Sequence, residues 1–400
     1  MIELEFSLIG EPTMTLQQLF EAFQAECSIA VRLKIMTWQQ AWPELLTYAL
    51  YDRGPDVSHV GSTWVSSLIG MNALRSFSEK EIRIMGGAGL FLPQCWQSGM
   101  MFGDSTVWSV PWSAYTFIIC YRRDILQKAG IVEEGAFKTA DALARTLTQL
   151  KAAGVECPWV VPVNPSHQDT LHYIASWIWG AGGDLVSADG ARLLFTQPLA
   201  LSGAQAYFDL LRYLSSDAFY LDDVHAEEYF LSGRAAVTIA GAEMPYSWLR
   251  NHVGSPEVLD NLGYALMPGV PWIGGDNLVV WKHTRFAVER EQASLALVDF
   301  LLKQSSQQVY CQGEEVFLPT RPDVFPALPM QGSLLAQTAI HSLQSGRAYH
   351  PMPMWSKIEH QSALTLGKIG EDVLAGKESG ASIHRHLDML ARRLEISLEQ

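Results

Sequence analysis

The opening segment of the chain predicts a strand, a helix and a second strand in immediate succession. Residues 2–10 (IELEFSLIG) alternate as a strand does, and residues 29–35 (IAVRLKI) return to a strand pattern. Between them, apolar side chains recur at helical spacing at Leu16, Leu19, Phe20 and Phe23. This order favours a parallel sheet, in which ligands contact the carboxyl ends of the strands. Residues 56–60 (DVSHV), followed by GSTW, repeat the arrangement.

Length and composition indicate a large globular protein. A chain of 400 residues exceeds what one hydrophobic core usually serves, so two lobes or a multilayered α/β domain are expected. Hydrophobic residues make up 48% and charged residues 18%, which separates the chain from disordered proteins. Its apolar runs are much shorter than the roughly 20 residues of a membrane helix, so we expect no membrane span.

Charge and cysteine usage exclude several classes of partner and site. The formal net charge is −14 and no block of Lys and Arg occurs, so binding to nucleic acid or to anionic lipid would oppose the protein's own field. The cysteines are odd in number and scattered, without a C-x-x-C pair, so we expect buried free thiols rather than zinc ligands or disulfides. They are Cys27, Cys95, Cys120, Cys157 and Cys311.

Motifs of catalysis and of cofactor binding are absent or incomplete. G-x-S-x-G, H-E-x-x-H and the phosphate-binding loop do not occur, and the GGAG and GAGG runs (86–89 and 180–183) lack a strand directly before them. The acidic run 222–228 suits a helix amino terminus better than a metal site, and His384 and His386 point to different faces of a helix. We therefore expect no catalytic residue, no cofactor and no metal.

Tryptophan is frequent near predicted turns and strand ends. Indole faces fit the C–H faces of sugar rings, whose hydroxyls need polar partners, so aromatic residues beside carboxylates in a cleft suit a carbohydrate. Any single tryptophan also suits a hydrophobic core, but the group as a whole favours a binding site. Its members are Trp38, Trp64, Trp112, Trp177, Trp248, Trp272 and Trp355.

Several segments, in this order, resemble the extracellular solute-binding proteins of ABC transporters, in the sugar-binding, maltose-binding-like group. The resemblance covers nearly the whole chain. It implies an α/β, two-lobed periplasmic-binding-protein-like fold of type II, each lobe a sheet flanked by helices, with a ligand cleft between the lobes. The segments are PDV (55–57), VPWSAYTFIICYRRDILQKAG (110–130), WIWGAGGDL (177–185), FTQPLA (195–200), YFLSGRAAVTIAG (229–241), the Pro- and Gly-rich run 267–281 and PMPMWSKIE (351–359).

Lobe boundaries follow from the same resemblance. Residues 1–110 with 268–312 are expected to form the amino-terminal lobe, and residues 111–267 with 313–400 the carboxyl-terminal lobe. Hinges are expected near Val110–Pro111 and Met267–Gly275, so that the lobes close on a ligand and turn binding into a signal.

The ligand site is expected to combine loop and strand-end residues. The resemblance implies that Trp112 and Tyr115 face the ligand, and that Glu243 occupies a position where this group of proteins often has a stacking tryptophan. A carboxylate at that position would accept hydrogen bonds or meet a cation. The expected ligand-binding residues are Glu11, Trp38, Thr63, Trp64, Trp112, Tyr115, Trp177, Glu243, Trp272, Asp276 and Trp355.

The function implied is binding of a small solute, with a mono- or oligosaccharide favoured, and its delivery to the membrane subunits of an ABC transporter. The protein would act as a monomer outside the cytoplasm, without enzymatic activity. Residues 2–10 carry no export signal, so a signal either has been removed or is not used. An alternative is a cytosolic ligand-sensing module of the same fold, which the unpaired cysteines also suit. A glycoside hydrolase using Glu11 or Glu243 with a second carboxylate is the least favoured hypothesis.

Overall fold

A computed structural model describes residues 2–164, 169–283 and 287–398. The chain forms two compact units, each built from several segments. Unit 1 comprises Met1–Tyr115, Ile273–Gln331 and Ala348–Ser356, and unit 2 comprises Thr116–Trp272, Gly332–Arg347 and Lys357–Gln400.

The sheet of unit 1 has the strand order β2-β1-β3-β8-β4. Strand β1 pairs in parallel with both β2 and β3, and β8 pairs antiparallel with β3. The strand–helix–strand prediction for the first segment is therefore confirmed. The bounds are β1 (Glu3–Ile9), β2 (Ala30–Met36), β3 (Val57–Gly61), β8 (Ile273–Val280), β4 (Ser109–Arg122, of which unit 1 holds the first half) and β9 (Leu318–Pro319).

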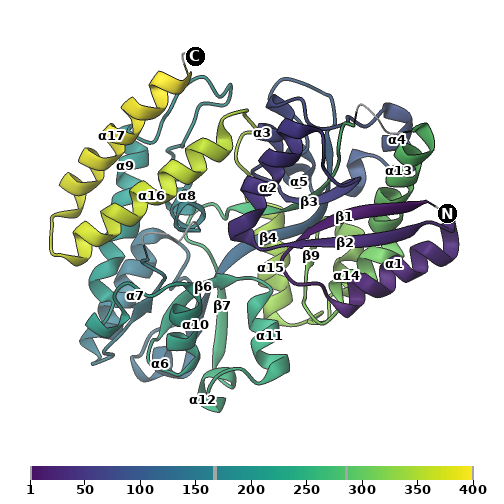
Figure 1. Ribbon diagram of the computed structural model, residues 1–400. Coiled ribbons are helices and arrows are strands. Elements are labelled where there is room, and N and C mark those ends of the chain that lie inside the picture. Colours follow the sequence, from purple (N-terminus) through teal and green to yellow (C-terminus); the bar gives the residue numbers. More distant parts are fainter. Residues whose placement is uncertain (1, 165–168, 284–286, 399–400) are drawn as a thin grey trace. The chain divides into compact units, whose positions relative to one another are not determined.

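Helices flank this sheet and bury their apolar stripes against it (Figure 1). In α1, Thr13 caps the amino terminus by accepting a hydrogen bond from the Leu16 amide, and Phe20 and Phe23 reach the core. The bounds are α1 (Met14–Cys27), α2 (Trp38–Tyr51), α3 (Val65–Gly70), α4 (Glu79–Ile84), α5 (Pro93–Gln97), α13 (Val288–Leu302) and α14 (Gln304–Cys311), with short 3-10 turns at Ala88–Leu90 and Pro322–Ala327.

Unit 2 has a smaller sheet of order β5-β6-β4-β7. The second half of β4 pairs antiparallel with β6 and β7, and β5 pairs in parallel with β6. The strands are β5 (Trp159–Val160), β6 (Val237–Gly241) and β7 (Leu262–Leu266). The helices are α6 (Arg123–Lys128), α7 (Ala140–Ala152), α8 (Thr170–Gly180), α9 (Pro198–Phe208), α10 (Asp223–Leu231), α11 (Met244–Asn251), α12 (Pro256–Leu259), α15 (Leu334–Ser345), α16 (Trp355–Leu374) and α17 (Ser379–Leu398), with 3-10 turns at Asp209–Tyr213 and Ser216–Ala218.

The last two helices of unit 2 form a hairpin, drawn in yellow-green and yellow in Figure 1. One carboxylate, that of Asp372 near the end of α16, accepts hydrogen bonds from Lys377 in the connection and from Ser382 and Arg385 on α17. Because the acceptor lies on α16 and its donors lie in the connection and on α17, Asp372 ties the two helices together.

The observed units differ from the predicted lobe boundaries by five residues at each crossover, 111–115 and 268–272, and in two longer segments. Residues 313–331 and 348–356 belong to unit 1, whereas the sequence-based prediction assigned them to the carboxyl-terminal lobe. The first segment carries β9, which pairs with Ser113 and Ala114 of β4. The second is anchored at Pro353, whose carbonyl accepts a hydrogen bond from the Ser67 hydroxyl at 2.9 Å. Each segment is held in unit 1 by contacts of only one or two residues. Such contacts leave no periodic pattern in the sequence, so periodicity does not reveal them.

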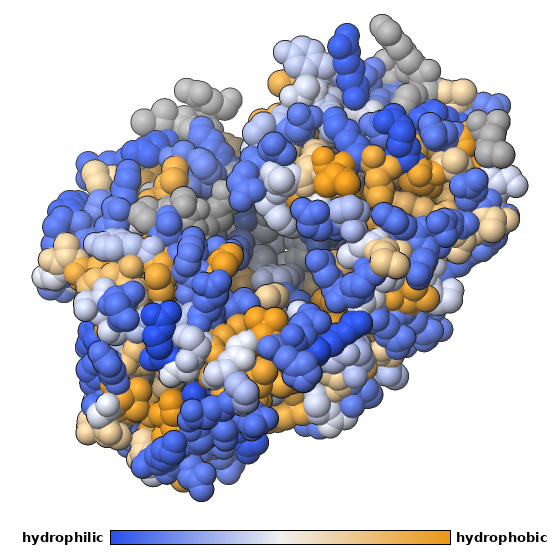
Figure 2. All heavy atoms as spheres, turned by 60° about the horizontal axis from the view of Figure 1, so that its bottom comes forward, coloured by the Kyte–Doolittle hydropathy of each residue, from blue (hydrophilic) through white to orange (hydrophobic). Residues whose placement is uncertain are grey.

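All five cysteines are unpaired, and Cys95, Cys120, Cys157 and Cys311 are buried, as the sequence predicts. Burial raises the pKa of the Cys95 and Cys311 thiols to about 12, so they stay protonated at neutral pH. In the described part of the chain, no helix has both the length and the apolar character needed to cross a membrane. The face drawn in Figure 2 is mainly hydrophilic, with hydrophobic side chains in small patches.

Candidate functional site

The carboxyl ends of three parallel strands meet along one edge of the unit 1 sheet. We call this the carboxyl edge and define it by residues 9–11, 36–38 and 61–64, which follow β1, β2 and β3. It brings four predicted site residues to the same edge: Glu11, Trp38, Thr63 and Trp64. Glu11 is exposed, and Thr63 and Trp64 are half-buried, so their side chains reach solvent.

Trp38 lies at this edge because of a helix cap. The Thr37 hydroxyl accepts a hydrogen bond from the Gln40 amide, so α2 begins at Trp38 directly after β2. The Trp38 side chain is 49% exposed and its ring lies edge-on to that of Trp64, with 5.7 Å between centroids. Gly61 lies beside this ring, and a Cβ there would make an ordinary contact with Trp38 at 3.5 Å.

Trp42 is a member of this aromatic group that the sequence reasoning missed. It lies one helical turn after Trp38, and its ring centroid is 5.5 Å from that of Trp64. The spacing of four residues on a helix that starts at Trp38 is the signal that could have found it. Trp38, Trp42 and Trp64 together form a group of indoles at the carboxyl edge, which we call the tryptophan platform.

Asp276 is held by groups from two other strands. Its Oδ2 accepts a hydrogen bond from the Ser113 hydroxyl at 2.7 Å, and its Oδ1 lies 2.9 Å from His59 Nε2, although not with the alignment of a hydrogen bond. Gly275 permits this close approach of β8 to β4, because it has φ +128° and a Cβ would collide with the Ser113 carbonyl. Asp276 is thus a predicted site residue with partners from β3 and β4.

Trp112 lies in the hydrophobic core of unit 1. It is 1% exposed, stacks on Tyr310 with 4.4 Å between centroids and lies edge-on to Phe6. The prediction that it faces a ligand finds no support in these surroundings, which instead make it a core residue behind the carboxyl edge. Tyr115, the last residue of unit 1, is half-buried.

Trp355 is also almost fully buried, at 1%, and its ring lies 4.3 Å from that of Tyr349. It lines a small pocket in unit 1, whose other described lining residues offer hydroxyl groups and no carboxylate, lysine or arginine. No hydrogen-bond partner for its Nε1 is found in the described part of the chain. The pocket is lined by Ser62, Thr63, Ser66, Ser98, Ile273, Ala348, Tyr349, His350, Pro351 and Trp355.

Unit 2 contains three predicted site residues. Trp177 is 2% exposed within α8 and packs edge-on against Tyr207, with 5.1 Å between centroids, as a core residue does. Trp272 is 5% exposed and stacks on His172 at 3.9 Å. Glu243 precedes α11 and is half-buried.

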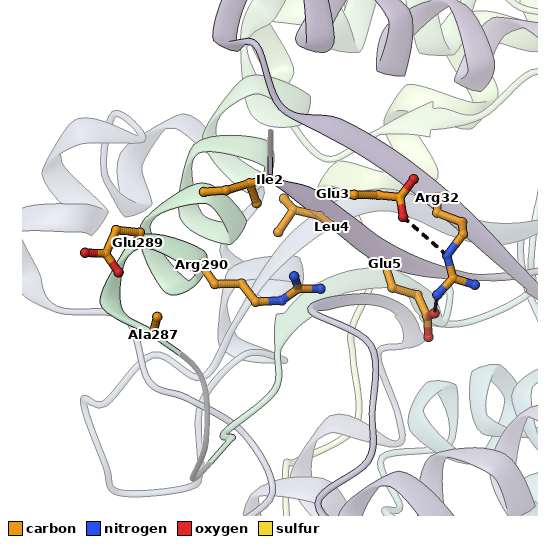
Figure 3. A pocket seen from close by; sticks show the side chains of 8 residues that line it. All are labelled: Ile2, Glu3, Leu4, Glu5, Arg32, Ala287, Glu289 and Arg290. Carbon is orange, nitrogen blue, oxygen red and sulfur yellow. Dashed lines mark hydrogen bonds and ion pairs between the residues drawn. The ribbon is translucent and has the colours of Figure 1, made fainter.

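Two further cavities lie away from these residues. One of about 540 Å³ is found at the amino ends of β1 and β2, where Arg32 pairs with Glu3 and Glu5 and Arg290 lies nearby (Figure 3). A second, of about 480 Å³, lies in unit 2 around Tyr229 and Arg234. Neither contains a predicted site residue. Within residues 2–164, 169–283 and 287–398, no group of three His, Cys, Asp or Glu is placed to hold a metal ion.

Comparison with known families identifies the class of protein. Residues 18–332 match the model of the bacterial extracellular solute-binding protein family, so the chain belongs to that family. No curated protein sequence matches it.

Solved structures show the same fold at low sequence identity. An ABC transporter solute-binding protein of Thermotoga lettingae, bound with α-D-tagatose, is 18% identical, with all of both chains covered and a TM-score of 0.79. Maltose-bound MalE3 of T. maritima is 18% identical, with 99% of this chain and 100% of that chain covered and a TM-score of 0.79. The sugar-binding protein MalE of Xanthomonas citri is 20% identical, with 99% and 97% covered and a TM-score of 0.79. The predicted fold class is therefore confirmed.

Proposed function

We propose that this protein binds a small uncharged solute, with a mono- or oligosaccharide favoured, and delivers it to the membrane subunits of an ABC transporter. The observation that carries the proposal is the tryptophan platform of Trp38, Trp42 and Trp64, which lies beside a pocket rich in hydroxyl groups. Both belong to unit 1, and Thr63 of the pocket is the neighbour of Trp64 in the chain.

The chemistry of the two features matches a sugar better than a charged solute. Exposed indoles offer apolar faces for C–H groups, and the hydroxyls of Ser62, Thr63 and Ser66 both donate and accept hydrogen bonds. A cationic solute would need a carboxylate, and none is among the described residues that line this pocket. Structural neighbours agree with this class, since they include solute-binding proteins bound with tagatose, maltose and ribitol.

Membership in an extracellular solute-binding family supports a location in the periplasm or outside the cell, and a role in binding rather than catalysis. Glu11, Glu243, Trp272 and Asp276 remain proposed contributors to the site, as do the monomeric state and the transporter partner. The five unpaired cysteines are the observation that favours the second candidate, a cytosolic sensor of the same fold.

A thermal-shift screen of sugars, polyols, amino acids and polyamines tests the ligand class. A ligand that binds only the folded state raises stability by about 2.7 kcal/mol at a hundredfold excess over Kd. We expect hits among neutral sugars or polyols. Stabilisation by a polyamine or an amino acid alone would contradict the proposal.

A matched pair of variants on α2 then tests the platform with the solute so identified. Trp38→Ala should weaken binding about fivefold, because an aromatic contact contributes roughly 1 kcal/mol. Tyr51→Ala removes another exposed ring, at the other end of the same helix, and should leave binding unchanged. Equal affinities of the two variants in calorimetry would remove the platform from the site.

A further inference from the structure

The imidazole of His59 connects two parts of the carboxyl edge. His59 lies on β3, is buried, and has Trp38 and Trp112 edge-on to its ring at 6.1 and 5.5 Å. Its Nδ1 accepts a hydrogen bond from the Ile9 amide at 3.2 Å, and its Nε2 lies 2.9 Å from Asp276 Oδ1. One side chain thus contacts the end of β1 and the carboxylate of β8.

The contact with Ile9 replaces a backbone hydrogen bond. The parallel pairing of β1 with β3 covers Phe6 and Ser7 and does not continue to Ile9. The next amide, that of Gly10, bonds to Met36 of β2 on the other side, so the Ile9 amide points toward β3 and meets the imidazole there. The residues that follow, Gly10 and Glu11, lead away from this anchor into the exposed loop.

The anchor requires one protonation state of His59. A neutral imidazole has one acceptor nitrogen and one N–H, so accepting from Ile9 at Nδ1 places the proton on Nε2, toward Asp276. An imidazolium has two N–H groups and no acceptor, so its Nδ1–H would oppose the Ile9 N–H. On the other side of the ring, Nε2 faces the carboxylate of Asp276 from β8, which is itself bonded to Ser113 of β4.

We propose that His59 is a positioning residue of the carboxyl edge whose protonation releases the end of β1. In the neutral form it holds the Ile9 amide and orients Asp276. In the charged form it retains Asp276 and loses Ile9, which loosens the loop that carries Glu11. The consequence for solute affinity rests on the proposed function, whereas the release of Ile9 can be measured without any ligand.

The test is the amide signal of Ile9 in protein labelled with 15N-isoleucine, assigned with Ile9→Val and titrated from about pH 8 to about pH 5, where histidine changes charge. We expect the Ile9 shift to move with the same midpoint as the His59 ring signals. His59→Asn can still accept from Ile9 through its side-chain oxygen but does not titrate, so its Ile9 signal should stay constant.

His252→Asn is the matched control, because it removes an exposed imidazole from a left-handed helix end that asparagine tolerates. In this variant the Ile9 amide shift should depend on pH as it does in the unmodified protein. A constant Ile9 shift in the unmodified protein, or a titration that persists in His59→Asn, would overturn the proposal.

A second variant covers the case in which His59→Asn does not fold. His59→Gln can donate to Asp276 from the position of Nε2 but leaves the Ile9 amide without its acceptor. Its Ile9 shift should match the acid end point of the unmodified protein at every pH. A shift matching the neutral end point would show that the imidazole does not hold Ile9.

Discussion

The tryptophans at the carboxyl edge of unit 1 and Trp177 of unit 2 occupy different positions within their secondary-structure elements. Trp38 opens α2 two residues after β2 and Trp64 caps α3 three residues after β3, and the rings of both reach solvent. Trp177 lies inside α8, every residue of which is buried from Thr170 to Trp179. The same residue type thus presents an exposed ring in one region and packs into the core in the other. The position within the element, rather than the residue type, distinguishes the two roles.

Removing buried indoles should produce the largest effects. We expect Trp177→Ala and Trp112→Ala each to lower the free energy of unfolding by about 3–5 kcal/mol, because a large cavity replaces rings packed on Tyr207 and Tyr310. Trp38→Ala should cost less than about 1 kcal/mol, since half of its surface already faces water. Urea unfolding of the three variants measures this, and an equal cost at Trp38 and Trp177 would break the comparison.

Two glycines beside these rings should show whether backbone conformation or lack of space makes an added side chain costly. Gly275→Ala should cost about 1–3 kcal/mol, because its φ of +128° disfavours a side chain and its Cβ would collide with the Ser113 carbonyl. Gly61→Ala should cost less, since its Cβ would only touch Trp38 at 3.5 Å. Thermal unfolding compares the two. A larger loss at Gly61 would show that the platform is tightly constrained rather than open.

The ion pair of Arg75 with Glu81 in unit 1 should make a small, pH-dependent contribution to the free energy of unfolding. Arg75 donates two hydrogen bonds to Glu81, of 2.6 and 2.7 Å, and with the Ser78 amide lowers the pKa of this carboxyl to about 2. A folded-state pKa below the usual 4.5 means that the ion pair stabilises unit 1 above that pH. The contribution is lost as the pH falls from about 4.5 toward 2.

Glu81→Gln should therefore lower the free energy of unfolding by about 1–2 kcal/mol at pH 7 and by much less near pH 2. Glu79→Gln is the control, because Glu79 is almost fully exposed and its pair with Arg83 is 3.6 Å long. Urea unfolding at both pH values measures the difference. The same loss at pH 7 and pH 2 would argue against the ion pair as its cause.

Regular patterns made much of the fold predictable. Alternation and helical spacing locate β1, α1 and β2, and the order of short segments leads to the correct family. The residues 348–356 could not be placed in unit 1 from periodicity, because a few contacts such as that of Pro353 with Ser67 hold them there.

The candidate site was predictable where residues follow strand ends. Trp38, Thr63 and Trp64 lie at the carboxyl edge as parallel pairing requires. Trp42 was missed because it lies within a helix, and His59 because it lies within a strand that reads as core. Trp112 follows a proline and resembles a strand-end residue, yet β4 already begins at Ser109, so the ring enters the core. The pattern of residue types along the sequence does not show at which residue a strand becomes buried by the elements packed on it.

The interleaved segments of unit 1 have a consequence for synthesis. In the finished sheet β8 lies between β3 and β4, but it is encoded more than 200 residues after β3. A growing chain that has emerged as far as β4 therefore holds β3 with an unpaired edge, which is a place where chains associate wrongly. Unit 1 can be completed only after Ser356 has emerged, more than 290 residues after the end of β3.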